Sequence, residues 1–100
     1  MSFHASAENI RVDDGHILRA NLNGQDAELD LNSCLGNNNG RFEWGGRDFA
    51  SSAENITFSI EGGANVPVLR ARLGGPDGPR DADVNLGERI SNDNGQLRFN

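Results

Sequence analysis

The sequence GNNNGRFEW at residues 36–44 has the pattern of a β-hairpin, and a close copy, SNDNGQLRF, occupies residues 91–99. In each copy an Asn-Gly pair supplies a turn, because both residues tolerate positive φ angles. Apolar residues then alternate with polar ones, as in a strand with one buried face. A hairpin that occurs twice with nearly the same residues predicts a duplicated unit.

The duplication extends along the chain on both sides of these hairpins. Residues 3–10 recur as residues 49–56, residues 17–22 as residues 68–73, and residues 29–31 as residues 84–86. The second copy is longer around residues 61–65 and 74–79, which are rich in Gly and Pro, as loop insertions are. Each copy has about 50 residues, too few to bury a stable core alone. We therefore expect one domain over residues 1–100, with intertwined repeats at about residues 1–46 and 47–100.

The apolar pattern between the hairpins predicts strands. Leu18, Ala20 and Leu22 alternate with polar residues, and Ile56, Phe58 and Ile60 do the same in the second copy. This alternation is typical of antiparallel sheets with one solvated face. Residues 30–35 and 85–90 do not alternate and are expected to form short helical turns. The sequence thus predicts a mostly β fold.

Composition excludes several classes of function. The net charge is −6 and the nine basic residues form no cluster, so neither nucleic acid nor an anionic membrane surface is expected as a partner. No apolar run is long enough for membrane insertion. The N-terminus lacks the pattern of a signal peptide, which favours a cytoplasmic or unconventionally released protein. The one cysteine, Cys34, permits no internal disulfide and is expected to be half-buried.

Two other classes of function are less consistent with the residues present. His4 and His16 are the only histidines, and the adjacent Asp13 and Asp14 would point to opposite faces of a strand, so we expect no catalytic residues and no enzyme. The alternative is a small calcium-binding or purely structural β module. The Asn92–Asn94 tip offers oxygen ligands but one carboxylate, so neither metal nor cofactor is expected. A calcium titration followed by thermal stability would separate the calcium module from sugar binding.

The two copies together resemble the cyanovirin-N homolog lectin family. The resemblance rests on Leu29-Asp30-Leu31-Asn32…Asn37…Asn39-Gly40…Phe42…Trp44…Phe49 and on Val84-Asn85-Leu86…Ile90…Asn92…Asn94-Gly95…Leu97…Phe99. It covers nearly the whole chain. In lacking cysteine pairs and the pattern of a signal peptide, this sequence is similar to the fungal members of the family.

The resemblance implies a pseudo-symmetric fold and a particular replacement for disulfides. Two triple-stranded antiparallel sheets would each be completed by a β-hairpin from the other repeat. The founding cyanobacterial member closes each repeat by a disulfide, and the matching positions here are Ala7 with Leu22 and Ala53 with Leu73. These apolar pairs could pack together, so the fold would be held by burial alone.

The resemblance also implies carbohydrate binding. The expected ligands are high-mannose oligosaccharides or glycoproteins that end in α1-2-linked mannose, whose hydroxyls match Asn, Asp and Arg side chains. The chain is expected to be monomeric, although a domain-swapped dimer could form through the connection at residues 45–48. Trp44 aligns with Phe99 and is therefore interpreted as a core residue rather than a platform for sugar.

Matching positions give two candidate carbohydrate-binding sites. The N-terminal-half site comprises Ser2, Ser6, Asn23, Gln25, Asp26, Asn92, Asp93 and Asn94. The C-terminal-half site comprises Asn37, Asn39, Arg47, Asp48, Ser51, Ser52, Gly75 and Asp77. In the second site Gly36 replaces an acid of the family, and a loop arginine has no clear match, with Arg80 a candidate substitute. We therefore expect the N-terminal-half site to bind better.

Overall fold

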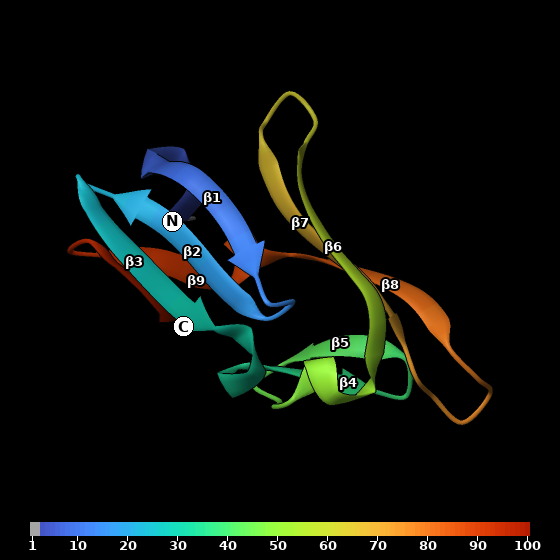
Figure 1. The fold of residues 1–100 in the computed structure, drawn as a ribbon. Helices are drawn as coiled ribbons and strands as arrows, with labels where there is room; N and C mark the ends of the chain where they lie inside the picture. The colour runs from blue at the N-terminus through green and yellow to red at the C-terminus, as the bar shows by residue number, and fades with distance from the viewer. Residues whose placement is uncertain (1–2) are drawn as a thin grey trace.

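The computed structural model describes residues 3–100 and contains the same series of elements twice, with η denoting a 3₁₀ helix (Figure 1). The first series is η1 (Phe3–Ser6), β1 (Ala7–Asp13), β2 (Ile17–Leu22), β3 (Gln25–Asp30), η2 (Leu31–Ser33), β4 (Leu35–Asn38) and β5 (Arg41–Trp44). The second series is η3 (Phe49–Ser52), β6 (Ala53–Glu61), β7 (Val66–Leu73), β8 (Arg80–Asn85), η4 (Leu86–Glu88), β9 (Ile90–Asp93) and β10 (Gln96–Phe99). The predicted mostly β fold is confirmed, and η2 and η4 are the predicted helical turns. No helix within residues 3–100 has the length and apolar character needed to cross a membrane.

Each three-stranded sheet is completed by a hairpin from the other repeat. The antiparallel sheets have the strand orders β1-β2-β3 and β6-β7-β8, and β4-β5 and β9-β10 form separate hairpins. Strand β10 contacts β3, whereas β5 contacts β8. Figure 1 shows the β9–β10 hairpin beside the first sheet and the β4–β5 hairpin beside the second. The exchange of hairpins that the family resemblance implies is therefore present.

Asparagines with positive φ angles set the turns and bulges in both repeats. The two hairpin turns have φ values of 53° and 54° at Asn39 and Asn94, each followed by a glycine at 89°. Asn9 and Asn55 also have positive φ, and each lies where the register of its strand shifts against the neighbouring strand. Asparagine tolerates this region because its short polar side chain bonds locally. The duplicated sequence thus specifies duplicated irregularities as well as duplicated strands.

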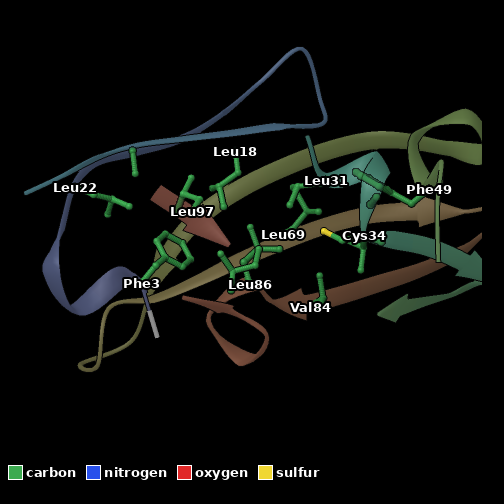
Figure 2. Close-up of a cluster of buried hydrophobic side chains, with 14 of the residues drawn as sticks. Phe3, Leu18, Leu22, Leu31, Cys34, Phe49, Leu69, Val84, Leu86 and Leu97 are labelled. Atoms are coloured by element: carbon green, nitrogen blue, oxygen red, sulfur yellow. The ribbon is translucent and has the colours of Figure 1, made fainter. Parts of the chain in front are cut away.

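Both repeats contribute to one hydrophobic cluster (Figure 2). Phe3 and Phe49 occupy equivalent places and are both fully buried. Trp44 packs against this core and stacks on Phe99, with ring centroids 5.8 Å apart and planes 17° apart. The Arg89 guanidinium lies 5.2 Å from the centroid of the Phe99 ring. Trp44 is thus committed to packing, in agreement with its alignment to Phe99.

Two expectations about burial were wrong. Cys34 was expected to be half-buried, but only 2% of it is exposed, because it lies within the cluster that the two repeats share. Ile60 was placed on the covered face of a strand, but it is 43% exposed. Ile60 pairs with Pro67 near the tip of the β6–β7 hairpin, which extends beyond the rest of the molecule (Figure 1). Alternation alone could not show that the covering elements end before this point.

Stability should not depend on any covalent link. Cys34 is a free thiol and is buried, so we expect a reducing agent to leave the melting temperature unchanged. Burial also raises the pKa of the Cys34 thiol, so an alkylating reagent should modify it much more slowly in the folded protein than in urea. Mass spectrometry after timed alkylation measures this difference. A large fall in melting temperature under reducing conditions would instead show a stabilising intermolecular disulfide.

Asp30 should make the free energy of unfolding depend on pH in the acidic range. Its Oδ1 lies 2.9 Å from His16 Nδ1 and accepts a hydrogen bond from the Asn32 N–H at 2.9 Å, which caps η2. The hydrogen bond with His16 is the main cause that lowers the pKa of the Asp30 carboxyl. A carboxyl whose pKa is lowered by folding stabilises the fold above its unfolded pKa of about 4, and loses that contribution as the pH falls through the folded pKa.

Asp30→Asn keeps a residue that can cap a helix but removes this titration. The variant should lose less stability than the parent chain between neutral and acidic pH, as measured by urea unfolding at a series of pH values. An unchanged pH profile would show that Asp30 does not contribute to it.

The connection between the repeats is compact and held by Asn32. The Asp48 N–H donates to the Asn32 carbonyl at 2.9 Å, and the Ala50 N–H donates to its side-chain oxygen at 3.1 Å. Gly46 lies close to the backbone of β4, since a Cβ on Gly46 would be 2.8 Å from the Gly36 Cα atom. Closure within one chain is also favoured by its high effective concentration.

We expect a monomer in solution, and we expect Gly46→Ala to increase the fraction of dimer, because the added methyl group disfavours the compact connection. Sedimentation of both proteins at micromolar concentration measures this. An obligate dimer of the unsubstituted chain would contradict the prediction.

Candidate functional site

Two equivalent asparagines organise the hairpin tips. Asn92 Nδ2 donates to Ser6 Oγ at 3.1 Å, while the Gly95 N–H donates to Asn92 Oδ1 at 2.8 Å. In the other half, Asn37 Nδ2 donates to Ser52 Oγ at 2.8 Å, and the Gly40 N–H donates to Asn37 Oδ1 at 2.9 Å. Each asparagine therefore closes the turn of its own hairpin and ties that hairpin to the 3₁₀ helix of the other repeat.

The N-terminal-half site gathers most of its described candidates around Asn92 and Gly95. Gln25 begins β3 and lies against the turn, since a Cβ at Gly95 would be 2.7 Å from its Nε2. Asp93 pairs with Arg98 at 2.8 Å, which fixes the carboxylate beside the turn. Asn94 is exposed at the tip itself.

Asn23 and Asp26, the two further described candidates of this half, lie around the start of β3, beside Gln25. Asn23 is exposed in the turn between β2 and β3, with a φ of 54°. Asp26 lines a separate depression of about 320 Å³ with Arg11, Arg19 and Glu28. The side chains at positions 25 and 26 point to opposite sides of β3, as successive side chains in a strand do. Ser2 lies outside the described residues.

The C-terminal-half site combines the hairpin with the loop that joins β7 to β8. Asn37 Nδ2 also donates to the Gly74 carbonyl at 2.7 Å. A Cβ at Gly75 would lie 3.2 Å from the Asn39 carbonyl oxygen, so this loop is packed closely on the turn. A cavity of about 310 Å³ opens here, and we call it the tip cavity. Its lining residues are Asn38, Asn39, Arg41, Pro76, Asp77 and Arg80.

The remaining candidates of this half lie along the connection between the repeats. Asp48 forms a β-bridge with Gly36, and its carbonyl accepts a hydrogen bond from Ser51 Oγ at 2.8 Å. Arg47 is exposed. A Cβ at Gly36 would lie 2.9 Å from the backbone nitrogen of Arg47. The backbone thus leaves no space at position 36 for the acid that the family resemblance implies there.

Asn39 and Asp77, two predicted site residues, line the tip cavity, and so does Arg80, the candidate substitute, whereas Arg41 was not predicted. The Arg80 guanidinium lies 3.6 Å from the Asp77 carboxylate. The signal for Arg41 was available, because it aligns with Gln96 in the second copy and directly follows the turn.

The two sites present amides, hydroxyls, carboxylates and guanidinium groups on rigid turns. Such groups can hydrogen-bond to neighbouring hydroxyls that both donate and accept. Within residues 3–100, no group of three or more His, Cys, Asp or Glu side chains is arranged to hold a metal ion. The arrangement therefore suits recognition of a neutral or charged polar ligand.

Comparison with known proteins shows the same architecture along nearly the whole chain. The family model for the CVNH domain matches residues 3–98 of this chain. A cyanovirin-N homolog from Neurospora crassa is 44% identical, over 98% of this chain and 97% of the relative. The NMR structure of the Gibberella zeae CVNH protein superposes with a TM-score of 0.90 at 52% identity, covering 97% of this chain and 95% of that one. A Microvirin:mannobiose complex has the same fold, with a TM-score of 0.85 at 23% identity over the full length of both chains.

Proposed function

The chain belongs to the CVNH family of lectins, and from this premise we propose that it is a non-catalytic lectin for mannose-rich glycans that end in α1-2-linked mannose. The observation that carries the proposal is the pair of hydrogen-bonded tips around Asn37 and Asn92. Each tip holds polar groups at fixed positions through hydrogen bonds within the chain. Fixed groups lose little conformational entropy when they bind a sugar hydroxyl.

The two sites support binding to branched glycans. A hydrogen bond contributes a net free energy of about 0.5–1.5 kcal/mol, so one shallow site should bind with a dissociation constant on the order of micromolar to millimolar. One site lies in each half of the molecule, so a glycan or glycoprotein with several mannose ends can engage both. Such multivalent binding raises the apparent affinity without any new contact. In line with the sequence comparison, we propose that the N-terminal-half site is the better binder of neutral mannose.

An NMR titration with α1-2-linked mannobiose tests the proposal. The amides of Gly95 and Gly40 are the reporters, because each donates to the asparagine at the centre of one site. We expect saturable shifts of Gly95, with weaker shifts of Gly40, and smaller responses to N,N′-diacetylchitobiose as a matched disaccharide. If mannobiose at millimolar concentration moves neither amide nor its neighbours, the lectin proposal fails. Shifts confined to Gly40, Asp48 and Ser52 would reverse only the ranking of the two sites.

A further inference from the structure

A groove of about 870 Å³ lies beside the tip cavity and has a different chemical character. It opens where the start of β5 faces β7 and β8, and we call it the arginine groove. Its charged lining residues are Arg41, Arg70, Arg72, Arg80, Asp81 and Asp83. Four arginines and two aspartates line it, so the lining itself carries more basic than acidic groups on a protein whose net charge is −6, and Glu61 and Asp77 lie beside Arg70 and Arg80. Arg41 and Arg80 line both the groove and the tip cavity, so the two adjoin each other.

Three of these arginines replace neutral amides of the other half. Arg80 pairs with Leu73 as Gln25 pairs with Leu22. Arg41 follows its turn as Gln96 follows the turn of the second hairpin.

Arg72 is the third arginine of this kind. It pairs with Asp81 across the strands as Asn21 pairs with Asp26.

The side-chain packing confirms that Arg80 and Gln25 are equivalent. A Cβ at Gly40 would lie 3.0 Å from the Arg80 Cδ atom, just as one at Gly95 would approach Gln25. The Arg80 stem is therefore held over the turn, its guanidinium lies beside Asp77, and the residue lines both the tip cavity and the groove. The corresponding depression of the N-terminal half has only about 320 Å³.

Three of the four guanidinium groups that line the groove remain available to a ligand. Arg70 is engaged by both carboxylate oxygens of Glu61. Arg72 and Arg80, in contrast, have looser partners, Asp81 at 3.8 Å and Asp77 at 3.6 Å, and the two arginine side chains are about half exposed. Arg41 makes no ion pair within residues 3–100. Exposed pairs of this kind are weak, so an anion with several oxygens can displace them.

We propose that the arginine groove is an anion subsite that extends the C-terminal-half site, so that this half binds saccharides carrying an anionic group such as a phosphate. Guanidinium groups bind phosphate and carboxylate oxygens through two parallel hydrogen bonds. The sugar ring would lie in the tip cavity beside Asn39 and Asp77, and the anionic group would lie near Arg41 and Arg80. The inference rests on the proposed function for the sugar part of the ligand. The two halves would then differ in specificity, with an amide-lined site for neutral mannose and an arginine-lined site for acidic sugars.

NMR titrations with mannose 6-phosphate, methyl α-mannoside and inorganic phosphate, at constant ionic strength, test this inference. We expect mannose 6-phosphate to shift the Gly40 amide and the amides of β8, with an affinity about tenfold above that of either single component. Sulfated mannose and mannuronic acid in further titrations identify which anionic group is preferred. If mannose 6-phosphate binds no more tightly than inorganic phosphate, the groove is an anion site without a sugar, and the proposal is overturned.

The two copies supply the matched variants. Arg41→Gln with Arg80→Gln introduces the residues of the other half, and it should abolish the tenfold gain while leaving the mannobiose response of Gly95 unchanged. Arg11→Gln removes an exposed arginine outside the groove and should preserve the gain. A gain that survives the double substitution overturns the proposal.

Failure of the subsite and failure of the proposed function give different results. Mannobiose binding with no contribution from the phosphate overturns only the anion subsite. Binding of mannose 6-phosphate through Arg41 and Arg80, with no response to mannobiose at either tip, supports the subsite and overturns the neutral-mannose function.

Discussion

Replacing Leu22 or Leu73 by alanine is expected to lower the free energy of unfolding by about 2–5 kcal/mol each. Both side chains are fully buried, and they pair across the strands with Ala7 and Ala53. The family resemblance matches each alanine–leucine pair to the two cysteines of a disulfide. Truncation removes apolar contacts and leaves a cavity that the two sheets cannot close without shifting. For a chain of this size the melting temperature should fall by roughly 10 °C or more. Urea unfolding followed by circular dichroism measures the loss.

The matched control is Ile60→Ala, which removes an aliphatic side chain that is 43% exposed. Because Ile60 lies outside the buried cluster and is partly exposed, the free energy of unfolding of this variant should change much less, by about 1 kcal/mol or below. The contrast between the two kinds of variant is the informative result. If Leu22→Ala and Leu73→Ala were as mild as the control, the apolar pairs would not be what replaces the disulfides.

The fold was predictable because its determinants are local and occur twice. The Asn39-Gly40 and Asn94-Gly95 turns require positive φ angles, and the sequence places there two residue types that accept them readily. Ala7 and Leu22 are far apart in the sequence, but the family resemblance pairs them, and the strand register confirms the pairing. Repetition adds information, since an interpretation made on one copy can be checked on the other.

Features that depend on contacts between elements could not be predicted in the same way. Cys34 lies in an irregular segment whose burial depends on the packing of both repeats. The close approach of Gly36 and Gly46 is a backbone contact, and glycine in a sequence does not show which partner approaches it. The arginine groove arises where β5 of one repeat meets β8 of the other, so its lining is scattered along the chain.

Duplication also separates what the fold requires from what a binding site can vary. Asn37 and Asn92 make the same two hydrogen bonds in both halves, to a serine and from a glycine N–H, so they belong to the shared framework. The residues around them differ, and the exchange of amides for guanidinium groups is the main chemical difference between the halves. A framework that is fixed twice leaves the neighbouring positions free to diverge in specificity.

Asn92→Ala is therefore expected to weaken mannobiose binding at the N-terminal-half site by about 1–3 kcal/mol, which is the loss expected when a polar partner is removed and its neighbours are left unpaired. The substitution frees Ser6 Oγ and the Gly95 N–H together, so the turn loses the geometry that it presents to a ligand. Asp93→Ala should have a similar effect, because it removes a carboxylate that Arg98 fixes beside the same turn. Asn37→Ala and Asn39→Ala, in the other half, should reduce total mannobiose binding less.

Calorimetry and the Gly95 amide shift measure the loss at this site, and a melting curve verifies that each variant remains folded. Asn65→Gly is the matched control, because it removes an exposed asparagine side chain at a turn with positive φ, between β6 and β7, and glycine accepts that conformation. It should leave mannobiose binding unchanged. Because the hairpin tips contribute little to the buried cluster, Asn92→Ala should melt close to the parent chain. A folded Asn92→Ala protein that binds mannobiose as tightly as the parent and the Asn65→Gly control would place the sugar away from this tip and contradict the prediction.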